Sequence, residues 1–148
     1  MNTIIRKGTE RDIPALMQLI QELADFEKAP QEVANTGGQL KSDFLEHKAF
    51  DFLVAEVDGE VVGISLYYPR YSTWKGRCMY LEDLCVKSNF RGQGIGKKLL
   101  QATADEAQKA GAIRLDWQVL DWNTSASDFY KKMGAAIETE WWNCKWRL

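Results

Sequence analysis

The feature that most constrains the fold is a glycine-rich turn between a predicted strand and a predicted amphipathic helix. The strand is MYLEDLCV, residues 79–86, and the turn contains RGQGIG at residues 91–96. Glycine costs about 1 kcal/mol relative to alanine inside a helix, so three glycines at a helix start need another explanation. Glycines let a backbone approach a ligand closely, and the free N–H groups of a first helical turn attract anions. With Arg91, Lys97 and Lys98 around the turn, the sequence predicts a phosphate-binding loop.

Two common phosphate-binding motifs do not match this turn. A P-loop requires G-x-x-x-x-G-K-[ST], but position 91 is Arg and position 98 is Lys. A Rossmann fingerprint requires a third glycine at position 97, which is Lys. RGQGIG does resemble the R/Q-x-x-G-x-G/A motif of the GNAT acetyltransferase superfamily, in which it holds the pyrophosphate of acetyl-CoA. The alternative is a glycine-rich turn without a ligand, and the alternating glycines with flanking cations argue against it.

The hydrophobic periodicity predicts a mixed succession of strands and helices without repeats or long linkers. Asp-Gly in the segment DGE is a strong hairpin signal because both residues accept the positive φ angles of a tight turn. The predicted elements are a strand at 3–7, a helix at 9–27, a loop at 28–38, a helix at 39–47, hairpin strands at 52–57 and 61–68, a connection at 69–77, a strand at 79–86, a helix ending at Gly111, a strand at 113–119, a helix at 125–133 stopped by Gly134, and two closing strands within 135–148. This order predicts the α/β (α+β) class. Its resemblance to the GNAT fold implies a mixed, mostly antiparallel sheet flanked by about four helices, in a single domain spanning residues 1–148.

Composition excludes several classes of protein. The 148 residues carry a formal net charge of −2, which provides no basic field for nucleic acid. No stretch approaches the ~20 apolar residues of a membrane span, and the N-terminus lacks a signal-peptide pattern. The cysteines Cys78, Cys85 and Cys144 are odd in number and widely spaced, which favours free thiols and gives no metal-site spacing. We therefore expect a cytoplasmic protein without a metal.

Candidate catalytic residues lie near the turn and late in the chain. In the strand at 79–86, alternation should point Glu82 or Asp83 inward, where a desolvated Glu can act as a general base; an edge strand or a buried ion pair is the alternative. Tyr130 is usually a packing residue in such a helix, but the GNAT pattern implies a proton donor. Asn123 suits either a helix cap or a contact with CoA. Cys85 is expected to pack, because no histidine is near it in sequence to activate the thiol.

A closer resemblance extends through nearly the whole chain. The stretches LVAEVDGEVVGISLYYPRYSTWKGR, YLEDLCV, FRGQGIG, VLDWN and FYKKMGA are similar to those of the diamine acetyltransferase group. This group includes spermidine/spermine acetyltransferase and thialysine-acetylating relatives. The resemblance implies an acetyl-CoA-dependent N-acetyltransferase that is a homodimer and acts on a small cationic amine. Glu82 would be the base and Tyr130 the acid.

The resemblance also implies binding residues for both substrates. Contacts with CoA would come from Leu84, Cys85, Val86, Arg91, Gly92, Gln93, Gly94, Ile95, Gly96, Lys97, Asn123, Thr124, Ser125, Ala126 and Tyr130. Contacts with the acceptor would come from Phe26, Glu27, Ser72, Glu82, Asp116, Trp117, Gln118 and Glu140. No metal ligand is implied.

One departure from the polyamine enzymes bears on the acceptor. Those enzymes have an Asp two residues before the W-x-G element, where this chain has Ser72 in YSTWKG. Losing that carboxylate should weaken attraction for the distal ammonium of a long polyamine. A lysine-like or short diamine acceptor is therefore ranked above spermine. The alternatives are an acetyltransferase for protein lysines or N-termini, a non-catalytic acetyl-CoA-binding module and, more remotely, a nucleotide-binding protein.

Overall fold

The computed structural model describes residues 2–148, which form two compact units. The first unit ends at Trp117 and contains the sheet, and the second runs from Gln118 to Leu148 and contains one α-helix. The single domain expected for residues 1–148 stays a prediction.

A five-stranded sheet forms the centre of the first unit, with the strand order β1-β2-β3-β4-β5. Neighbouring strands from β1 to β4 are antiparallel, and β5 is parallel to β4. The strands are β1 (Thr3–Lys7), β2 (Asp51–Val57), β3 (Glu60–Ser72), β4 (Gly76–Val86) and β5 (Leu115–Asp116). The mixed, mostly antiparallel sheet predicted from the sequence is confirmed.

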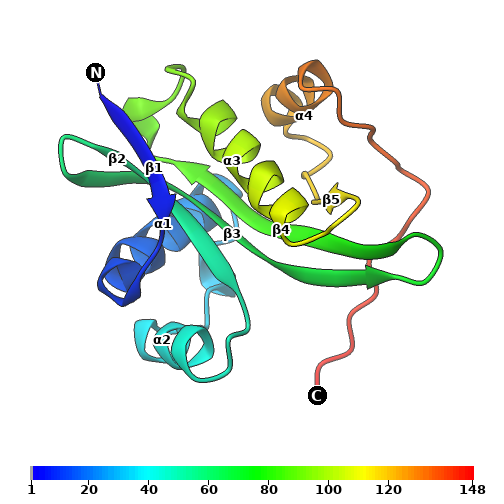
Figure 1. Ribbon diagram of the computed structural model, residues 1–148, viewed down its shortest axis with the longest axis horizontal. Helices are drawn as coiled ribbons and strands as arrows, with labels where there is room; N and C mark the ends of the chain where they lie inside the picture. The colour runs from blue at the N-terminus through cyan, green and yellow to red at the C-terminus, as the bar shows by residue number, and fades with distance from the viewer. Residues whose placement is uncertain (1) are drawn as a thin grey trace. The chain divides into compact units, whose positions relative to one another are not determined.

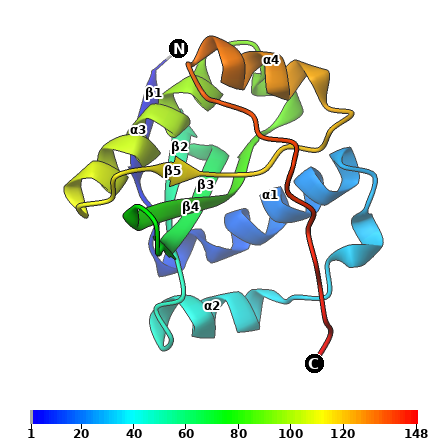
Figure 2. The same ribbon diagram turned by 90° about the vertical axis from the view of Figure 1, so that its right-hand side faces the viewer.

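Helices cover both faces of this sheet. The α-helices are α1 (Ile13–Phe26), α2 (Gly37–Leu45), α3 (Ile95–Lys109) and, in the second unit, α4 (Thr124–Lys132). Short 3-10 helices occupy Glu10–Asp12, Pro30–Glu32 and Ser88–Phe90. Helices α1 and α2 lie on one face of the sheet and α3 lies on the other (Figures 1 and 2). The first unit is therefore a three-layer structure.

Each face of the sheet has its own apolar cluster. On the α1 face, Leu16 and Leu19 pack with Phe52, and on the α3 face Leu99 packs with Val62. The apolar residues at helical spacing along α3 are buried: Ile95, Leu99, Leu100 and Ala107. The amphipathic pattern therefore identified the packing face of this helix correctly.

A buried pair of hydroxyl groups joins the sheet to α3. The Oγ of Ser65 lies 2.8 Å from the Oγ1 of Thr103, and Thr103 also donates to the carbonyl of Leu99 at 2.7 Å. Both side chains are fully buried, so these bonds satisfy polar groups that would otherwise be costly inside the core.

The turn and cap predictions are also confirmed. Asp58 and Gly59 have φ angles of 52° and 81°, as expected for a tight turn between β2 and β3. Gly111 follows α3 and Gly134 follows α4, both with positive φ. These left-handed conformations end the helices at low steric cost because glycine has no Cβ.

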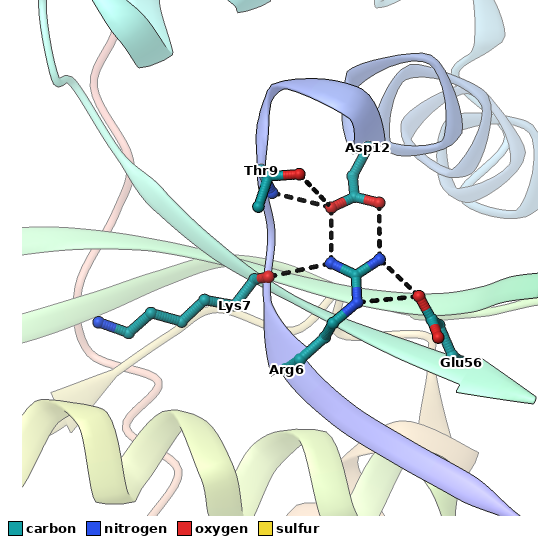
Figure 3. A network of polar contacts seen from close by, with 5 residues as sticks. All are labelled: Arg6, Lys7, Thr9, Asp12 and Glu56. Carbon is teal, nitrogen blue, oxygen red and sulfur yellow. Dashed lines mark hydrogen bonds and ion pairs between the residues drawn. The ribbon is translucent and has the colours of Figure 1, made fainter. Parts of the chain in front are cut away.

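An ion-pair network fastens the end of β1 to β2 and to the start of α1 (Figure 3). Arg6 makes a two-pronged contact with Asp12, at 2.7 and 2.9 Å, and also donates to Glu56. The backbone N–H and the hydroxyl of Thr9 donate to the same carboxylate of Asp12. Hydrogen bonding from Arg6 is the main reason that the pKa of Asp12 is lowered to about 2. This carboxylate therefore stays ionised at neutral pH and favours the folded state.

The two closing strands predicted within 135–148 are wrong. Residues 135–148 form neither helix nor strand, and the tryptophans that favoured strands there are exposed. Aromatic residues fit a half-buried pleated surface, but a strand also needs a neighbouring strand to pair its N–H and C=O groups. Propensity alone therefore overestimated the amount of sheet.

Three other boundaries differ from the predictions. The strand predicted at 113–119 is reduced to β5, whose pairing with β4 stops at Tyr80. The connection predicted at 69–77 is largely strand, because β3 and β4 continue as a long hairpin to Ser72 and Gly76. The helix predicted at 39–47 begins at Gly37, because Thr36 caps it through the N–H of Gln39. Pairing and capping extended the last two elements past weak local signals, whereas the limited pairing with β4 shortened the first.

Candidate active site

The glycine-rich loop has the backbone geometry of a ligand cradle. Gly92 and Gly94 have φ angles of 77° and 83°, which favour glycine. A Cβ added at either position would meet nothing within 4 Å, and one added at Gly96 would only touch Val86 at 3.9 Å. The loop is therefore open on the side where side chains would stand, which leaves room for the phosphates of a ligand.

The N-terminus of α3 adds hydrogen-bond donors to this cradle. The first intrahelical bond of α3 runs from the N–H of Lys98 to the carbonyl of Gly94. The preceding N–H groups of Ile95, Gly96 and Lys97 have no intrahelical acceptor, and Gly94 offers no capping side chain. These donors and the partial positive charge of the helix end favour an anion.

Arg91 holds the loop against neighbouring elements. Its Nε donates to the carbonyl of Val86 at 3.0 Å, and its guanidinium lies 4.8 Å from the ring centroid of Phe26. Phe26 ends α1 and was predicted to contact the acceptor. Here it supports the loop through Arg91, so one aromatic ring connects α1 to the predicted phosphate site.

Among residues 2–148, no strand pairs with β4 on its β5 side beyond Tyr80. Leu84, Cys85 and Val86 pair with β3, whereas β5 pairs with β4 only at Met79 and Tyr80. Peptide groups on this edge are suited to an extended chain such as the pantetheine arm. Burial raises the pKa of the Cys85 thiol to about 11, which agrees with a packing role for this cysteine.

A β-bulge in β4 disrupts the alternation that the sequence predicted for its carboxylates. Leu66 pairs with Asp83 and Tyr67 pairs with Leu81, so Glu82 is the extra residue in β4. The Oε1 of Glu82 accepts a hydrogen bond of 2.6 Å from the hydroxyl of Tyr68. Bulges often re-aim a side chain beside an active site, and this one gives Glu82 a geometry that regular pairing would not.

The expectation that Glu82 is the desolvated carboxylate needs correction. Glu82 is exposed, and its neighbour Asp83 is the more buried of the two. Burial, with the charges of Glu82 and Glu27 nearby, raises the pKa of Asp83 to about 7. Burial also raises the pKa of Glu27, at the end of α1. The structure therefore brings three carboxyl groups together where α1 faces β4.

The other residues predicted for the acceptor in the first unit have different surroundings. Asp116 pairs with Arg114 at 2.6 Å and with Arg70 at 3.6 Å, so two arginines partly neutralise its charge. Trp117 is half-buried directly after β5. Ser72 lies at the tip of the hairpin opposite Gly76, where its Oγ accepts from the N–H of Lys75.

Within one chain, Ser72 is remote from Glu82. Gly76 is six residues before Glu82 along β4, which corresponds to about 20 Å of extended strand. The structure therefore does not bring Ser72 to the bulge within one molecule. Its predicted contact with the acceptor is not formed by the same group of residues as Glu27 and Glu82.

The residues predicted from the second unit lie on α4 and around it. Asn123 caps α4 by accepting from the N–H of Ala126 at 3.2 Å, which confirms the capping alternative. Thr124 and Ser125 open the same helix, and the ring of Tyr130 packs against Phe129 at 5.4 Å.

Two further predicted residues lie outside the helices. Gln118 donates to the side chain of Asn143 at 2.7 Å, and exposed Glu140 accepts from the N–H of Thr139. The contacts expected from them and from α4 to CoA or the acceptor stay predictions.

Sequence reasoning missed two residues of this site. Asp83 was predicted as one of two carboxylates that could face inward, but the role of base was given to Glu82 and no site role to Asp83. Tyr68 carried no signal, because it is 14 positions from Glu82 and meets it only through the pairing of β3 with β4.

Within residues 2–148, no group of three or more His, Cys, Asp and Glu side chains is arranged to hold a metal ion. In the same part of the chain, no helix has the length and apolar character to cross a membrane.

Comparison with known proteins decides the family. The model of the acetyltransferase (GNAT) family matches residues 13–135, a range that includes the loop, both carboxylates of β4 and Tyr130. The chain belongs to the GNAT family. Acetyl-CoA is the acetyl donor of this family, and the open glycine loop at the start of α3 suits its phosphates.

Individual relatives of this GNAT protein indicate which group of acetyltransferases it is similar to. A thialysine N-epsilon-acetyltransferase of Bos taurus is 44% identical, covering 95% of this chain and 89% of its own length. A spermidine/spermine N(1)-acetyltransferase-like protein of Homo sapiens is 31% identical over 88% of this chain and 20% of its own length. A crystal structure of an aminoglycoside acetyltransferase from an uncultured soil metagenomic sample has a TM-score of 0.81 and 26% identity, covering 99% of this chain and 96% of the other. The protein is a GNAT N-acetyltransferase related to the thialysine enzymes, which confirms the family recognised from its motifs.

Proposed function

We propose that this enzyme transfers the acetyl group of acetyl-CoA directly to a primary amine of a small cationic acceptor. Lysine-like amino acids such as thialysine, or short diamines, are the favoured acceptors. The observation that carries the proposal is the carboxyl cluster of Glu27, Glu82 and Asp83 at the bulge of β4. This strand leads through the 3-10 helix Ser88–Phe90 into the glycine loop, so one segment would supply both an acidic acceptor site and a donor site.

The donor would be held along β4 and at the start of α3. Acetyl-CoA supplies an acetyl thioester. The N–H groups of Ile95, Gly96 and Lys97 would bind its pyrophosphate, and the open edge from Leu84 to Val86 would pair with its pantetheine arm. Asn123 to Ala126 would add contacts from the start of α4.

The carboxyl cluster would both bind the acceptor and prepare it for reaction. An alkyl ammonium has a pKa near ~10.4, so almost none of it is nucleophilic at neutral pH. Glu27 and Asp83 would attract the cation, and Glu82 would remove its proton directly or through water. Tyr130 would return a proton to the leaving thiolate. Each assignment is supported by position in the chain and by the family motif.

The choice of acceptor rests on the relatives and on Ser72. The Bos taurus relative is named for thialysine, whose reacting group is a side-chain amine. Ser72 replaces the acidic residue of the polyamine enzymes, which removes a partner for a distal ammonium. A lysine-like acceptor therefore ranks above spermine.

The test is an acetylation assay with a panel of amines. The purified protein with acetyl-CoA is expected to release free thiol with thialysine, lysine or short diamines. Because Glu82 and Tyr130 would move protons in the reaction, Glu82→Gln and Tyr130→Phe should each lower kcat by about 100-fold or more. Turnover of either variant at the wild-type rate would remove that residue from the mechanism.

The same assay separates the rival functions. An acetyltransferase for protein lysines or N-termini would prefer peptides to free amines, since it needs an open groove for the peptide. A non-catalytic module would bind acetyl-CoA without turnover on any amine. The carboxyl cluster at the bulge favours a cationic amine acceptor over a non-catalytic module, and the comparison of peptides with free amines decides the size of that acceptor.

Homodimer formation and a cytoplasmic location are further parts of the proposal. Trp141, Trp142 and Trp146 are 71–90% exposed, which is unusual for so many large aromatic side chains in a short segment. Burial of these rings against a second copy would remove that apolar surface from water. The three cysteines, all free, support a reducing compartment.

A further inference from the structure

The strongest side-chain contact of the exposed carboxylate Glu82 is with a tyrosine that the sequence did not single out. The hydroxyl of Tyr68 donates to Oε1 of Glu82 at 2.6 Å, in the range of a charge-assisted hydrogen bond. Among residues 2–148, no second donor to the Glu82 carboxylate is found. One carboxylate oxygen is therefore engaged, and Oε2 is left for another partner.

In this hydrogen bond, Tyr68 is held more rigidly than Glu82. Tyr68 lies within β3, packs against the apolar cluster on the α1 face, and has its ring centroid 5.6 Å from that of Tyr80. Burial and the bond to Glu82 raise the pKa of Tyr68, so its hydroxyl keeps its proton and remains a donor at neutral pH. Glu82 is exposed at a bulge, where the backbone pairing constrains it least.

We propose that Tyr68 is a positioning residue that engages Oε1 of Glu82 and directs Oε2 toward the acceptor amine. This inference rests on the proposed role of Glu82 as the base. A long exposed side chain samples several rotamers, and a carboxylate in the wrong rotamer cannot accept the proton of the acceptor. The hydrogen bond from a rigid strand selects one rotamer before the acceptor arrives, which is the preorganisation that proton transfer requires.

The neighbouring Tyr67 provides a matched control. It adjoins Tyr68 in β3 but belongs to the apolar cluster on the α3 face of the sheet. Tyr67→Phe and Tyr68→Phe each remove one hydroxyl from consecutive buried or half-buried rings of the same strand. Only the second change affects the carboxylate, so general damage to β3 is separated from loss of positioning.

The experiment is a double-mutant cycle measured with thialysine and acetyl-CoA. Tyr68→Phe should lower kcat about 10-fold, as expected for one charge-assisted hydrogen bond, with the KM for acetyl-CoA unchanged. Tyr67→Phe should stay within about twofold of wild type. In a Glu82→Gln background, Tyr68→Phe should have no further effect, because the group that it positions is already lost.

Several outcomes would overturn the inference. These are a wild-type kcat for Tyr68→Phe, an equal loss in Tyr67→Phe, or an undiminished effect of Tyr68→Phe in the Glu82→Gln background. If Glu82→Gln itself turns over normally, the proposed base fails. If only Glu82→Gln is impaired, the base stands and the positioning role fails.

A spectroscopic readout tests the contact without turnover. In protein labelled with ¹³C at glutamate side chains, the Glu82 carboxyl resonance is identified by its loss in Glu82→Gln. That resonance should shift in Tyr68→Phe and remain in place in Tyr67→Phe. An unchanged resonance in Tyr68→Phe would contradict the hydrogen bond, whatever the acceptor of the enzyme.

Discussion

At the scale of single residues, the proposed acceptor site contains two adjacent carboxyl groups in different environments. Glu82 is exposed and hydrogen-bonded to Tyr68, whereas Asp83 is partly buried next to Glu82 and Glu27. Burial and the two like charges disfavour ionisation of Asp83, so it exchanges a proton near neutral pH. A cationic acceptor would favour the ionised form, and for this reason the cost of burying Asp83 is consistent with a binding role.

Asp83→Asn should stabilise the free protein at high pH. The pKa of Asp83 is about 7 in the fold against an ordinary 3.8, so the folded state binds the extra proton between these values. Stability from this group is therefore complete below about pH 4 and is lost as the pH rises through 7. At pH 8 we expect Asp83→Asn to gain about 1–3 kcal/mol of unfolding free energy in urea titrations, with little difference near pH 4.

The exposed Asp128, on α4, provides the control for this titration. Asp128→Asn should leave the free energy of unfolding within about 0.5 kcal/mol of wild type at both pH values. Equal stabilities of wild type and Asp83→Asn at pH 8 would show that Asp83 is not held in an unfavourable ionised state.

At the scale of elements, the strand, loop and helix from β4 to α3 are the segment that we propose as the acetyl-CoA site. Gly94 is the N-cap of α3 with φ of 83°, and the space beside it is open. The N–H groups of the first helical turn, which follow this left-handed residue, have no intrahelical acceptor and can bind an anion. The same absence of side chains lets phosphates approach those groups.

Gly94→Ala should weaken the binding of acetyl-CoA. Alanine in left-handed backbone costs about 1–2 kcal/mol, and its methyl group would stand where the pyrophosphate is expected. We expect the KM for acetyl-CoA to rise about 10-fold, equivalent to ~1.4 kcal/mol, while the KM for the amine stays constant in steady-state kinetics.

Gly76→Ala is the matched control for this substitution. Gly76 also has positive φ, 106°, and open space beside it, but lies at the tip of the β3–β4 hairpin. It should lose stability in thermal unfolding without a change in the KM for acetyl-CoA. A similar KM for both glycine variants would mean that the loop at Gly94 does not hold the donor.

At the scale of the whole molecule, exposed aromatic surface is the feature that a single chain leaves unexplained. In the second unit, Trp142 and Trp146 are each 90% exposed. In the first unit, Trp74 at the β3–β4 hairpin is 87% exposed. Large exposed apolar side chains that gather in one segment, as in the C-terminal one, usually mark an interaction surface. A second copy of the chain is the partner that the sequence resemblance implies.

Light scattering should therefore give the mass of a dimer, twice 16.9 kDa, at micromolar concentration. Replacing both Trp142 and Trp146 with serine should shift the equilibrium toward monomer, because less apolar area would be buried on association. The exposed Trp122 is a control outside the C-terminal segment, and Trp122→Ser should keep the wild-type mass. A monomeric wild-type protein would contradict the proposed assembly.

Local signals explain which elements could be predicted. The inward face of α3, the Asp58-Gly59 turn and the glycine ends of α3 and α4 depend on neighbours within a few residues. The predicted strands within 135–148 failed because strand formation depends on a distant partner, which propensity does not report.

The sequence by itself determined the family, the glycine-rich turn before α3 and the acidic pair in β4, because each is a property of short contiguous segments. Only the tertiary structure decided which of the two carboxyl groups is exposed and which is partly buried. The register of β3 against β4 creates the bulge at Glu82 and brings Tyr68 to it, and the packing of α1 buries Asp83 near Glu27. Register and burial arise from contacts between residues far apart in the chain, so no local pattern contains them.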